Sequence, residues 1–356
     1  MIESTRVLGF IRRAGRGIGM GLHIPRIMNL PHLHAKLAPA FAVAILLSAC
    51  DKPAGPGAGG GAAPSAKSIA VIPKGTTHEF WKSVEAGARQ AGQELGVNIL
   101  WKGPLKENDR AQQIAIVEQF TSEGVNGIVL APLDNTALRR PVQAAMTKGI
   151  PVVIIDSALK GETGRDFVGY VGTNNSLAGF LAGQHLVQAL GGGGKVVMLR
   201  YMEGSASTAE REAGFLEAMR KARNIQVIVE NRYAGATASE AQTAALNMLD
   251  QLRDADGIFA SNESATFGLL LALRQHNLAG KAKFVGFDTS PPLIEALKKG
   301  EINALVAQNP RKIGYEGVKV MAAKLSGREV PATTDTGVKL ITKENLETSE
   351  IQELLK

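Results

Sequence analysis

The sequence predicts an α/β fold made of two similar doubly wound lobes, each with a parallel sheet covered by helices. From residue 68 onward, short and almost wholly apolar runs alternate with amphipathic stretches, as in buried parallel strands joined by helices. About ten such runs are more than one ordinary domain holds, which favours two domains. The expected strands are 69–72, 97–101, 127–130, 151–155, 167–171, 195–200, 225–229, 257–260, 283–287 and 303–307.

The stretches between these strands carry helix signals. Residues 82–95 place Val84, Ala88, Ala91 and Leu95 on one apolar stripe. Three capping-box patterns mark expected helix starts, at Asp109–Gln112, Ser207–Glu210 and Thr237–Glu240. Glycines stand where helices should end, at Gly96, Gly124 and Gly149.

The basic charge of the chain is concentrated ahead of its folded part. The formal net charge is +7, but residues 1–50 hold six basic residues and one acidic residue, which leaves +2 for residues 51–356. That charge is too small for an electrostatic grip on nucleic acid, so we expect no nucleic-acid partner.

Residues 1–49 have the features of a secretory signal peptide. The apolar run LAPAFAVAILLSA at 37–49 follows Lys36, ends in small residues and is too short to span a bilayer comfortably. The charged stretch before it is long, and a translation start at Met20 or Met28 stays an open alternative.

Cys50, the only cysteine, ends the sequence LSAC, which resembles the bacterial lipobox. The resemblance implies cleavage before Cys50 and lipidation of its sulfur. Asp51 resembles the signal that retains lipoproteins at the inner membrane of many Gram-negative bacteria. The Gly/Pro/Ala-rich residues after Cys50 complete a flexible linker over 50–67. No cysteine remains for a disulfide, a thiolate metal site or a thiol nucleophile.

Polar side chains and two aromatic residues follow several expected strands, at the sheet edge where open α/β folds bind ligands. Carboxylates and amides can each bind more than one hydroxyl, and aromatic rings cover the apolar face of a sugar, so the set suits a neutral polyol. Taken singly, the acids and amides could be helix caps, the arginine a surface charge and the aromatics core. The candidates are Phe80, Trp81, Asp156, Arg211, Asn262, Asp288 and Gln308.

Several stretches of the body resemble, in order, the ribose-binding-protein group of periplasmic sugar-binding proteins. They are FWKSVEAGA, GIPVVIID, TAEREAGF, GIFASNESATFG, FVGFDTSP and ALVAQNP, within a resemblance that covers about residues 68–342. It implies the type I periplasmic binding fold, with two lobes joined by a three-strand hinge near 172–173, 308–309 and 336–337. The amino lobe would be 68–172 plus 309–336, and the carboxyl lobe 173–308 plus 337–356.

The resemblance also implies a role for each candidate. Phe80 and Trp81 would sandwich a sugar, and Asp156 would bind its hydroxyls. Further polar contacts would come from Arg211, Asn262, Asp288 and Gln308. Ribose-type members usually have Asn-Pro before the aromatics and Arg after the first Asp, where this chain has His78-Glu79 and Ser157. Ribose itself is therefore not implied, and His78 either contacts the ligand or only orients its loop.

The implied function is that of an extracytoplasmic lipoprotein that captures a sugar or related polyol and delivers it to an ABC permease and its ATPase. We expect a monomer that lies on the periplasmic or cell-surface side of the cytoplasmic membrane, contacts the membrane only through its lipid, uses no cofactor or metal and catalyses no reaction. A receptor that presents its ligand to a membrane sensor stays an alternative, because partner surfaces are not visible in one sequence.

Rival classes lack their motifs. His78-Glu79 begins the zinc-protease pattern His-Glu-x-x-His, but Lys82 stands where the second histidine is needed. The sequence GGGGK at 191–195 is followed by valine, so it is no phosphate loop. An enzyme with Asp156 and Asp288 as paired acids is the remaining catalytic alternative. A sugar-responsive repressor would need a helix-turn-helix where the signal peptide stands.

Overall fold

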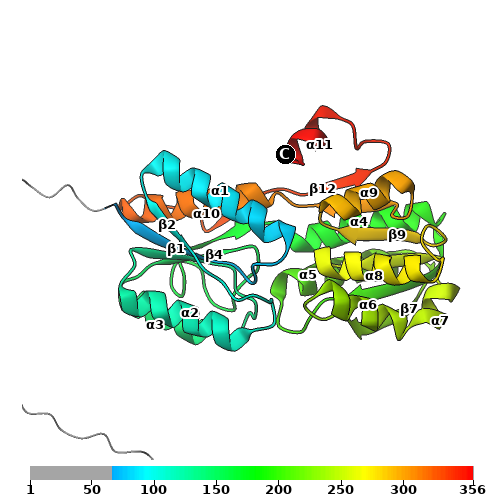
Figure 1. The fold of residues 1–356 in the computed structure, drawn as a ribbon, viewed down its shortest axis with the longest axis horizontal. Coiled ribbons are helices and arrows are strands. Elements are labelled where there is room, and N and C mark those ends of the chain that lie inside the picture. Colours follow the sequence, from blue (N-terminus) through cyan, green and yellow to red (C-terminus); the bar gives the residue numbers. More distant parts are fainter. Residues whose placement is uncertain (1–65, 356) are drawn as a thin grey trace, which may run out of the picture. The chain divides into compact units, whose positions relative to one another are not determined.

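The structure is a computed structural model that describes residues 66–355. The predictions for the signal peptide, Cys50 and most of the linker lie outside the described residues. Residues 66–355 form two six-stranded sheets, each with helices on both faces (Figure 1). The predicted α/β fold with two doubly wound lobes is confirmed. Across these residues, no helix combines the length and apolar character needed to cross a membrane.

The first sheet has the order β11-β5-β4-β3-β1-β2, and all its neighbours pair in parallel. Its inner strands are almost completely buried, because helices cover both of their faces. The strands are β1 (Ser68–Ile72), β2 (Asn98–Trp101), β3 (Gly127–Leu130), β4 (Val152–Ile155), β5 (Gly169–Gly172) and β11 (Thr333–Asp335).

Two helix pairs cover this sheet. Helices α1 (Glu79–Leu95) and α10 (Pro310–Leu325) pack on one face, and α2 (Arg110–Glu123) and α3 (Arg139–Thr147) pack on the other (Figure 1). The first pair approaches closely at a glycine, since a Cβ added to Gly87 would lie 1.9 Å from the carbonyl oxygen of Arg311. This contact ties a late segment of the chain to the first sheet.

The second sheet has the order β12-β10-β9-β8-β6-β7 and is parallel except for β12, which runs antiparallel to β10. Its inner strands β8 and β10 are fully buried. The strands are β6 (Gly193–Arg200), β7 (Asn224–Tyr233), β8 (Gly257–Ala260), β9 (Lys283–Phe287), β10 (Ala304–Ala307) and β12 (Lys339–Thr342).

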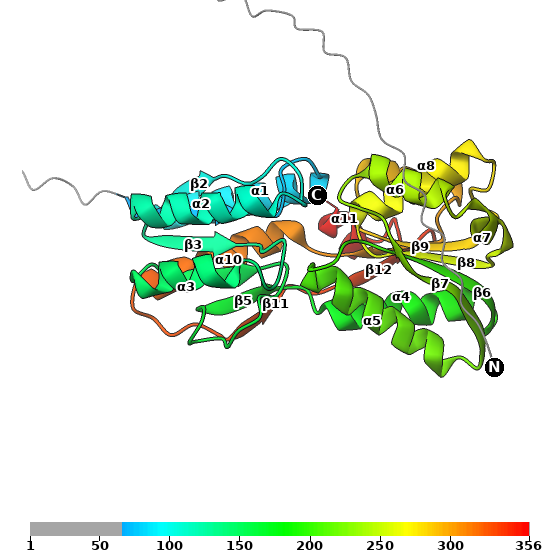
Figure 2. The same cartoon turned by 90° about the horizontal axis from the view of Figure 1, so that it is seen from below.

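Helices α4 (Asn175–Ala189) and α5 (Ala206–Lys221) cover one face of the second sheet (Figure 2). The other face is covered by α6, α7, α8 and α9, and the C-terminal helix α11 adds Ile351 to the same core. The bounds of these helices are α6 (Ala238–Leu246), α7 (Leu249–Asp254), α8 (Glu263–Gln275), α9 (Pro291–Lys299) and α11 (Ser349–Leu354).

The chain passes from one sheet to the other three times, between β5 and α4, between β10 and α10, and between β11 and β12. We call the half built on the first sheet the amino lobe and the half built on the second sheet the carboxyl lobe. The residue boundaries of the lobes given above stay a prediction.

The helix starts test the capping-box patterns. Asp109 accepts a hydrogen bond from the backbone N–H of Gln112, and Thr237 forms a complete capping box with Glu240. The prediction for Ser207 was wrong, because α5 begins at Ala206 with Ser205 as its N-cap. The Ser207 hydroxyl has a different partner, described below.

Candidate ligand-binding site

A small cavity of about 30 Å³ lies between the lobes, lined by residues that follow strands of both sheets. This volume is far below the roughly 300–1,000 Å³ of most small-molecule sites, so little free space remains between the side chains that line it. The structure brings all the predicted ligand-binding residues to this one cavity. They are His78, Phe80, Trp81, Asp156, Arg211, Asn262, Asp288 and Gln308.

The two aromatic residues lie in the first turn of α1 and contact each other edge to face, with ring centroids 4.9 Å apart and planes at 90°. Phe80 is partly buried, whereas Trp81 is only 2% exposed and packs in the amino-lobe core. Trp81 therefore packs in the amino-lobe core and also lines the cavity, so both roles considered from the sequence apply to it.

Glu107, in the loop before α2, accepts hydrogen bonds from three directions. Trp81 donates its Nε1–H over 2.7 Å, Tyr201 donates its hydroxyl over 2.7 Å, and His78 Nδ1 lies 2.7 Å from the same carboxylate. Burial opposes both charges of the His78–Glu107 pair, but mutual attraction and their hydrogen bond raise the pKa of His78 to about 9 and lower the pKa of Glu107 to about 2. Both are therefore ionised at neutral pH.

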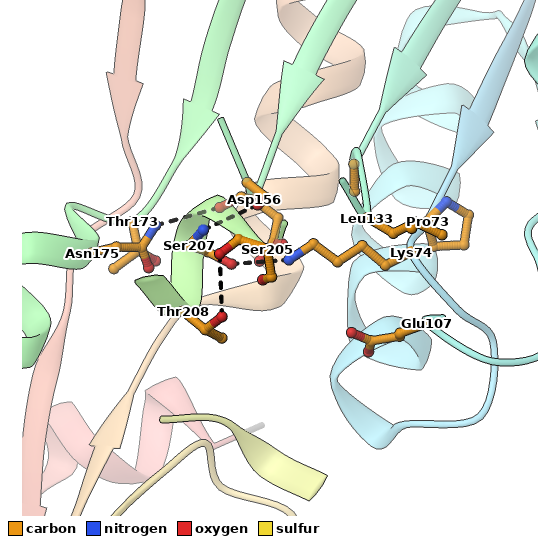
Figure 3. A network of polar contacts seen from close by, with 12 residues as sticks. Pro73, Lys74, Glu107, Leu133, Asp156, Thr173, Asn175, Ser205, Ser207 and Thr208 are labelled. Atoms are coloured by element: carbon orange, nitrogen blue, oxygen red, sulfur yellow. Dashed lines mark hydrogen bonds and ion pairs between the residues drawn. The ribbon is translucent and has the colours of Figure 1, made fainter. Parts of the chain in front are cut away.

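Lys74 extends from the loop after β1 to the carboxyl lobe (Figure 3). Its Nζ donates to Ser207 Oγ over 2.9 Å and lies 2.9 Å from Asp156 Oδ2. The contact with Asp156 is an ion pair without the alignment of a hydrogen bond, so Oδ2 stays available as an acceptor. Both side chains are about 5% exposed or less, so the charges compensate each other away from solvent.

Arg211 lies in the second turn of α5, which begins at Ala206. It is 2% exposed, and its guanidinium lies over the ring of Phe287 at 4.4 Å from the centroid. Nε donates to Asn175 Oδ1 over 2.8 Å, and Nη1 donates to the carbonyl oxygen of Ser261 over 3.0 Å. These contacts exclude the interpretation of Arg211 as a surface charge.

Asp288 links the carboxyl lobe to the hinge. Gln308 Nε2 donates to its Oδ1 over 2.8 Å, and Gln308 in turn accepts a 3.0 Å hydrogen bond from the hydroxyl of Thr173. Two of the three passages between the lobes are thus joined by one side-chain bond. Asn262 is a helix N-cap as well as a cavity residue, since its Oδ1 accepts from the N–H of Ala265 over 3.1 Å.

Glu263, the first residue of α8, reaches across the cavity to α1. Its carboxylate accepts from the backbone N–H groups of Phe80 and Glu79 over 3.1 and 3.4 Å, where His78 supplies no side-chain cap. Burial and repulsion by Asp288 raise the pKa of Glu263 to about 6, against the opposing effect of His78 and these N–H groups.

Sequence reasoning missed several residues of this cavity. Lys74 and Tyr201 follow β1 and β6 closely, so the strand-end rule that found Asp156 could have found them. Glu107 comes from a loop before a helix and carries no sequence signal. The missed residues are Lys74, Glu107, Tyr201, Ser207, Thr208 and Glu263.

The chemistry that this site offers is hydrogen bonding and stacking. Within residues 66–355, no three or more histidine, cysteine, aspartate or glutamate side chains are grouped to hold a metal ion. Charged acceptors and donors from both lobes surround a small space with one aromatic wall. A compact ligand with many hydroxyls matches this arrangement.

Known proteins share this architecture. The ribose import binding protein of Salmonella typhimurium is 31% identical over 283 residues, which are 78% of this chain and 90% of that protein. A carbohydrate transporter solute-binding protein of Agrobacterium radiobacter, solved with D-arabinose, superposes with a TM-score of 0.79 at 31% identity and covers 83% of this chain and 100% of its own. A solute-binding protein of Agrobacterium vitis, solved with D-fucose, gives a TM-score of 0.78 at 33% identity, over 81% of this chain and 100% of its own.

The sequence also matches the periplasmic binding protein domain over residues 69–329, a range that contains β2 to β10, α1 to α10 and all of β1 except Ser68. The chain belongs to the periplasmic binding protein family and to its ribose-binding-protein-like group.

Proposed function

We propose that this protein is an extracytoplasmic lipoprotein that captures a monosaccharide or related polyol between its lobes and delivers it to an ABC importer. The relatives support a sugar ligand, since they are named for ribose import or were solved with D-arabinose and D-fucose. They are binding and transport proteins, and the prediction that this chain is not an enzyme is confirmed by its membership of that group.

The observation that carries the proposal is the composition of the cavity wall. Asp156 and the two aromatics belong to the amino lobe, whereas Arg211, Asn262 and Asp288 belong to the carboxyl lobe, with Gln308 at a passage between them. A sugar held by groups from both lobes binds the closed form more tightly than the open form, and this difference in affinity drives closure. Hinge closure of periplasmic binding proteins is an established example of such a change.

The hinge division that we propose follows the three passages. The amino lobe is 68–172 plus 309–336, and the carboxyl lobe is 173–308 plus 337–356. An ABC permease and its ATPase would accept the form in which the two lobes are closed. The protein would act as a monomer. Limited proteolysis tests the division, because cuts near 172–173, 308–309 or 336–337 should slow when a bound sugar closes the cleft.

The lipid anchor belongs to the same proposal. Cys50 follows LSA, and the linker 50–67 leads from it to β1, so we propose that the sugar-binding body is tethered to the outer side of the cytoplasmic membrane. Cys50→Ser should move the protein from the membrane fraction to the soluble fraction and change its processing. Unchanged fractionation and processing would show that the anchor is wrong.

A thermal-shift screen tests the sugar-binding function. D-Ribose, D-allose, D-arabinose, D-fucose and inositols would be added singly to the purified protein. A ligand that binds only the folded state raises the melting temperature by mass action, progressively as its concentration exceeds Kd. The proposal predicts such a rise for at least one compound, which should be recovered unaltered. Chemical conversion of a sugar would contradict it.

A further inference from the structure

Glu107 is a buried carboxylate with three hydrogen-bonding partners around it, and only 6% of the residue is exposed. A buried charge is tolerated in a protein interior only when such partners are present. Two of the partners, Trp81 and His78, belong to the ligand site itself. Glu107 therefore fixes the position of an indole and an imidazole on the cavity wall.

The third partner comes from the other lobe. Tyr201 follows β6 directly, is 1% exposed and donates its hydroxyl to Glu107 Oε2 over 2.7 Å. Burial and the nearby Glu107 raise the pKa of Tyr201 well above its ordinary value, so the hydroxyl stays a donor. A hydrogen bond to an ionised acceptor is stronger than one between neutral groups. This bond requires the lobes to be together.

Within the amino lobe, the loop after β1 packs closely against the loop that carries Glu107. A Cβ added to Gly75 would lie 2.9 Å from Glu107 Cγ and 3.3 Å from its backbone nitrogen. The loop after β1 can approach the Glu107 loop this closely only because residue 75 has no side chain. Lys74, next to it, adds a positive charge that also lowers the pKa of Glu107.

We propose that Glu107 is a positioning residue of the ligand site, which orients Trp81 and His78 and couples their orientation to lobe closure through Tyr201. When the lobes separate, Glu107 exchanges the Tyr201 hydroxyl for water, and the indole loses part of its fixed environment. When they close, the three donors hold the carboxylate, and the aromatic wall of the cavity is set. The ligand-coupled part of this inference rests on the proposed sugar-binding function.

The protonation of His78 gives this role a measurable signature. His78 faces the carboxylates of Glu107, Glu263 and Asp288, and Glu107 faces His78 and Lys74. With Glu107 present, the pKa of His78 is about 9, so the imidazolium persists through neutral pH. Removing the charge of Glu107 leaves burial, the largest influence and one that lowers the His78 pKa, opposed only by Glu263 and Asp288, so this pKa should fall well below 9.

The chain offers a built-in reporter, because it contains two tryptophans, Trp81 and Trp101. In the full chain with Trp101→Phe, all tryptophan emission comes from Trp81. Glu107→Gln and Tyr201→Phe would be compared with Tyr233→Phe, which removes a hydroxyl from an exposed tyrosine of the same lobe. Each protein is titrated with D-ribose and D-arabinose, and Trp81 quenching by acrylamide is measured with and without sugar.

We expect Tyr201→Phe to weaken binding of the sugar that binds wild type by roughly tenfold, since it removes a bond to a charged group. Glu107→Gln should weaken it by roughly tenfold or more, since it removes the charge that all three partners contact. Glu107→Gln should also change the pH profile of binding, because the step due to His78 moves from about pH 9 to lower pH. Glu107→Gln should expose Trp81 to acrylamide more than Tyr233→Phe does, with and without sugar. Tyr201→Phe should do so only with sugar, because the open form lacks the Tyr201 bond already.

The role of Glu107 would be overturned if wild type binds a sugar and both variants show the same affinity, pH profile and Trp81 quenching as wild type. If neither D-ribose nor D-arabinose binds wild type, another sugar or polyol is the ligand, and the sugar-free quenching decides about Glu107. Equal quenching in Glu107→Gln and Tyr233→Phe then counts against it. Should Glu107→Gln fail to fold, as judged by circular dichroism, Tyr201→Phe carries the same decision.

Discussion

Asp156 and Asp288 occupy matching positions in the two lobes, and both have a left-handed backbone, with φ of 61° and 67°. Each directly follows a strand, β4 or β9, and each backbone N–H donates over 2.9 Å to the next strand, at Val171 or Val306. Side chains other than glycine rarely adopt this conformation, although Asp and Asn tolerate it best. The same strained turn thus carries a carboxylate to the cavity in both lobes, and such strain is typical of functional sites.

The two aromatic residues should respond differently to substitution. Phe80→Ala should weaken sugar binding by roughly two- to tenfold with little loss of stability, because a partly buried ring facing the cavity is removed. Trp81→Phe should lower the free energy of unfolding by about 1–3 kcal/mol, because Glu107 loses a buried donor. Calorimetry and urea unfolding measure the two effects. Equal stability losses would show that both residues are simply core.

Lys74 and Asp156 should be energetically coupled. Lys74→Met leaves a buried carboxylate without its cation and should lower the free energy of unfolding by about 3–5 kcal/mol. Adding Asp156→Asn removes the unpaired charge and should restore part of that loss, while asparagine tolerates the left-handed backbone. Urea unfolding of the two single variants and the double variant gives the coupling. Additive losses would argue against a buried ion pair.

The contact between Gly204 of the carboxyl lobe and Asp134 of the amino lobe, which we call the cleft rim, allows a test of lobe closure with a matched control. Gly204 has φ of +88°, and an added Cβ would lie 2.4 Å from Asp134 Oδ2 in the amino lobe, whereas Gly192, with φ of +89°, has no such neighbour within 4 Å. The carbonyl oxygen of Gly204 also accepts from the N–H of Asn135 over 2.9 Å. Alanine at either glycine should cost about 1–2 kcal/mol of backbone strain.

Only Gly204→Ala should also weaken sugar binding and oppose the contraction seen by small-angle scattering, because its clash arises only when the lobes approach. Gly192→Ala serves as the control for strain. Identical binding by the two variants would mean that this rim does not take part in closure.

The raised pKa of Glu263 has a defined consequence for stability. A pKa of about 6 in the folded protein, above the ordinary 4.5, means that folding favours protonated Glu263, so this stabilisation is present below pH 4.5 and is lost as the pH rises through 6. Glu263→Gln should therefore raise the free energy of unfolding at pH 8, on the order of 2 kcal/mol, and have little effect near pH 4. Exposed Glu79→Gln is the control. Destabilisation at pH 8 would show that the charged cap on α1 outweighs its burial.

The strands that the sequence revealed are those buried on both faces. Apolar runs such as GIVL of β3 and GIFA of β8 marked the central strands closely. Strands β11 and β12 were not expected, since TTD and KLIT lie at sheet edges and need no continuous apolar run. Their pairing depends on where the chain crosses between the sheets, which local sequence does not encode.

The site was predictable where a residue directly follows a strand, as Asp156 and Asp288 do. The start of α5 was predicted wrongly, because the capping pattern at Ser207 lies two residues after the true N-cap, Ser205. Glu107 could not be found from local signals, since its role depends on two loops and the opposite lobe meeting in space.

The most direct test of a sugar shared by two lobes is calorimetric titration of three proteins with the monosaccharide that gives the largest thermal shift. The proteins are wild type, Asp156→Asn in the amino lobe and Asp288→Asn in the carboxyl lobe, substitutions that keep the left-handed backbone tolerable. Wild type should bind one sugar per chain, and each variant should lose about 1–3 kcal/mol of binding free energy while remaining folded. Wild-type affinity in either variant would contradict the claim that both lobes hold the ligand.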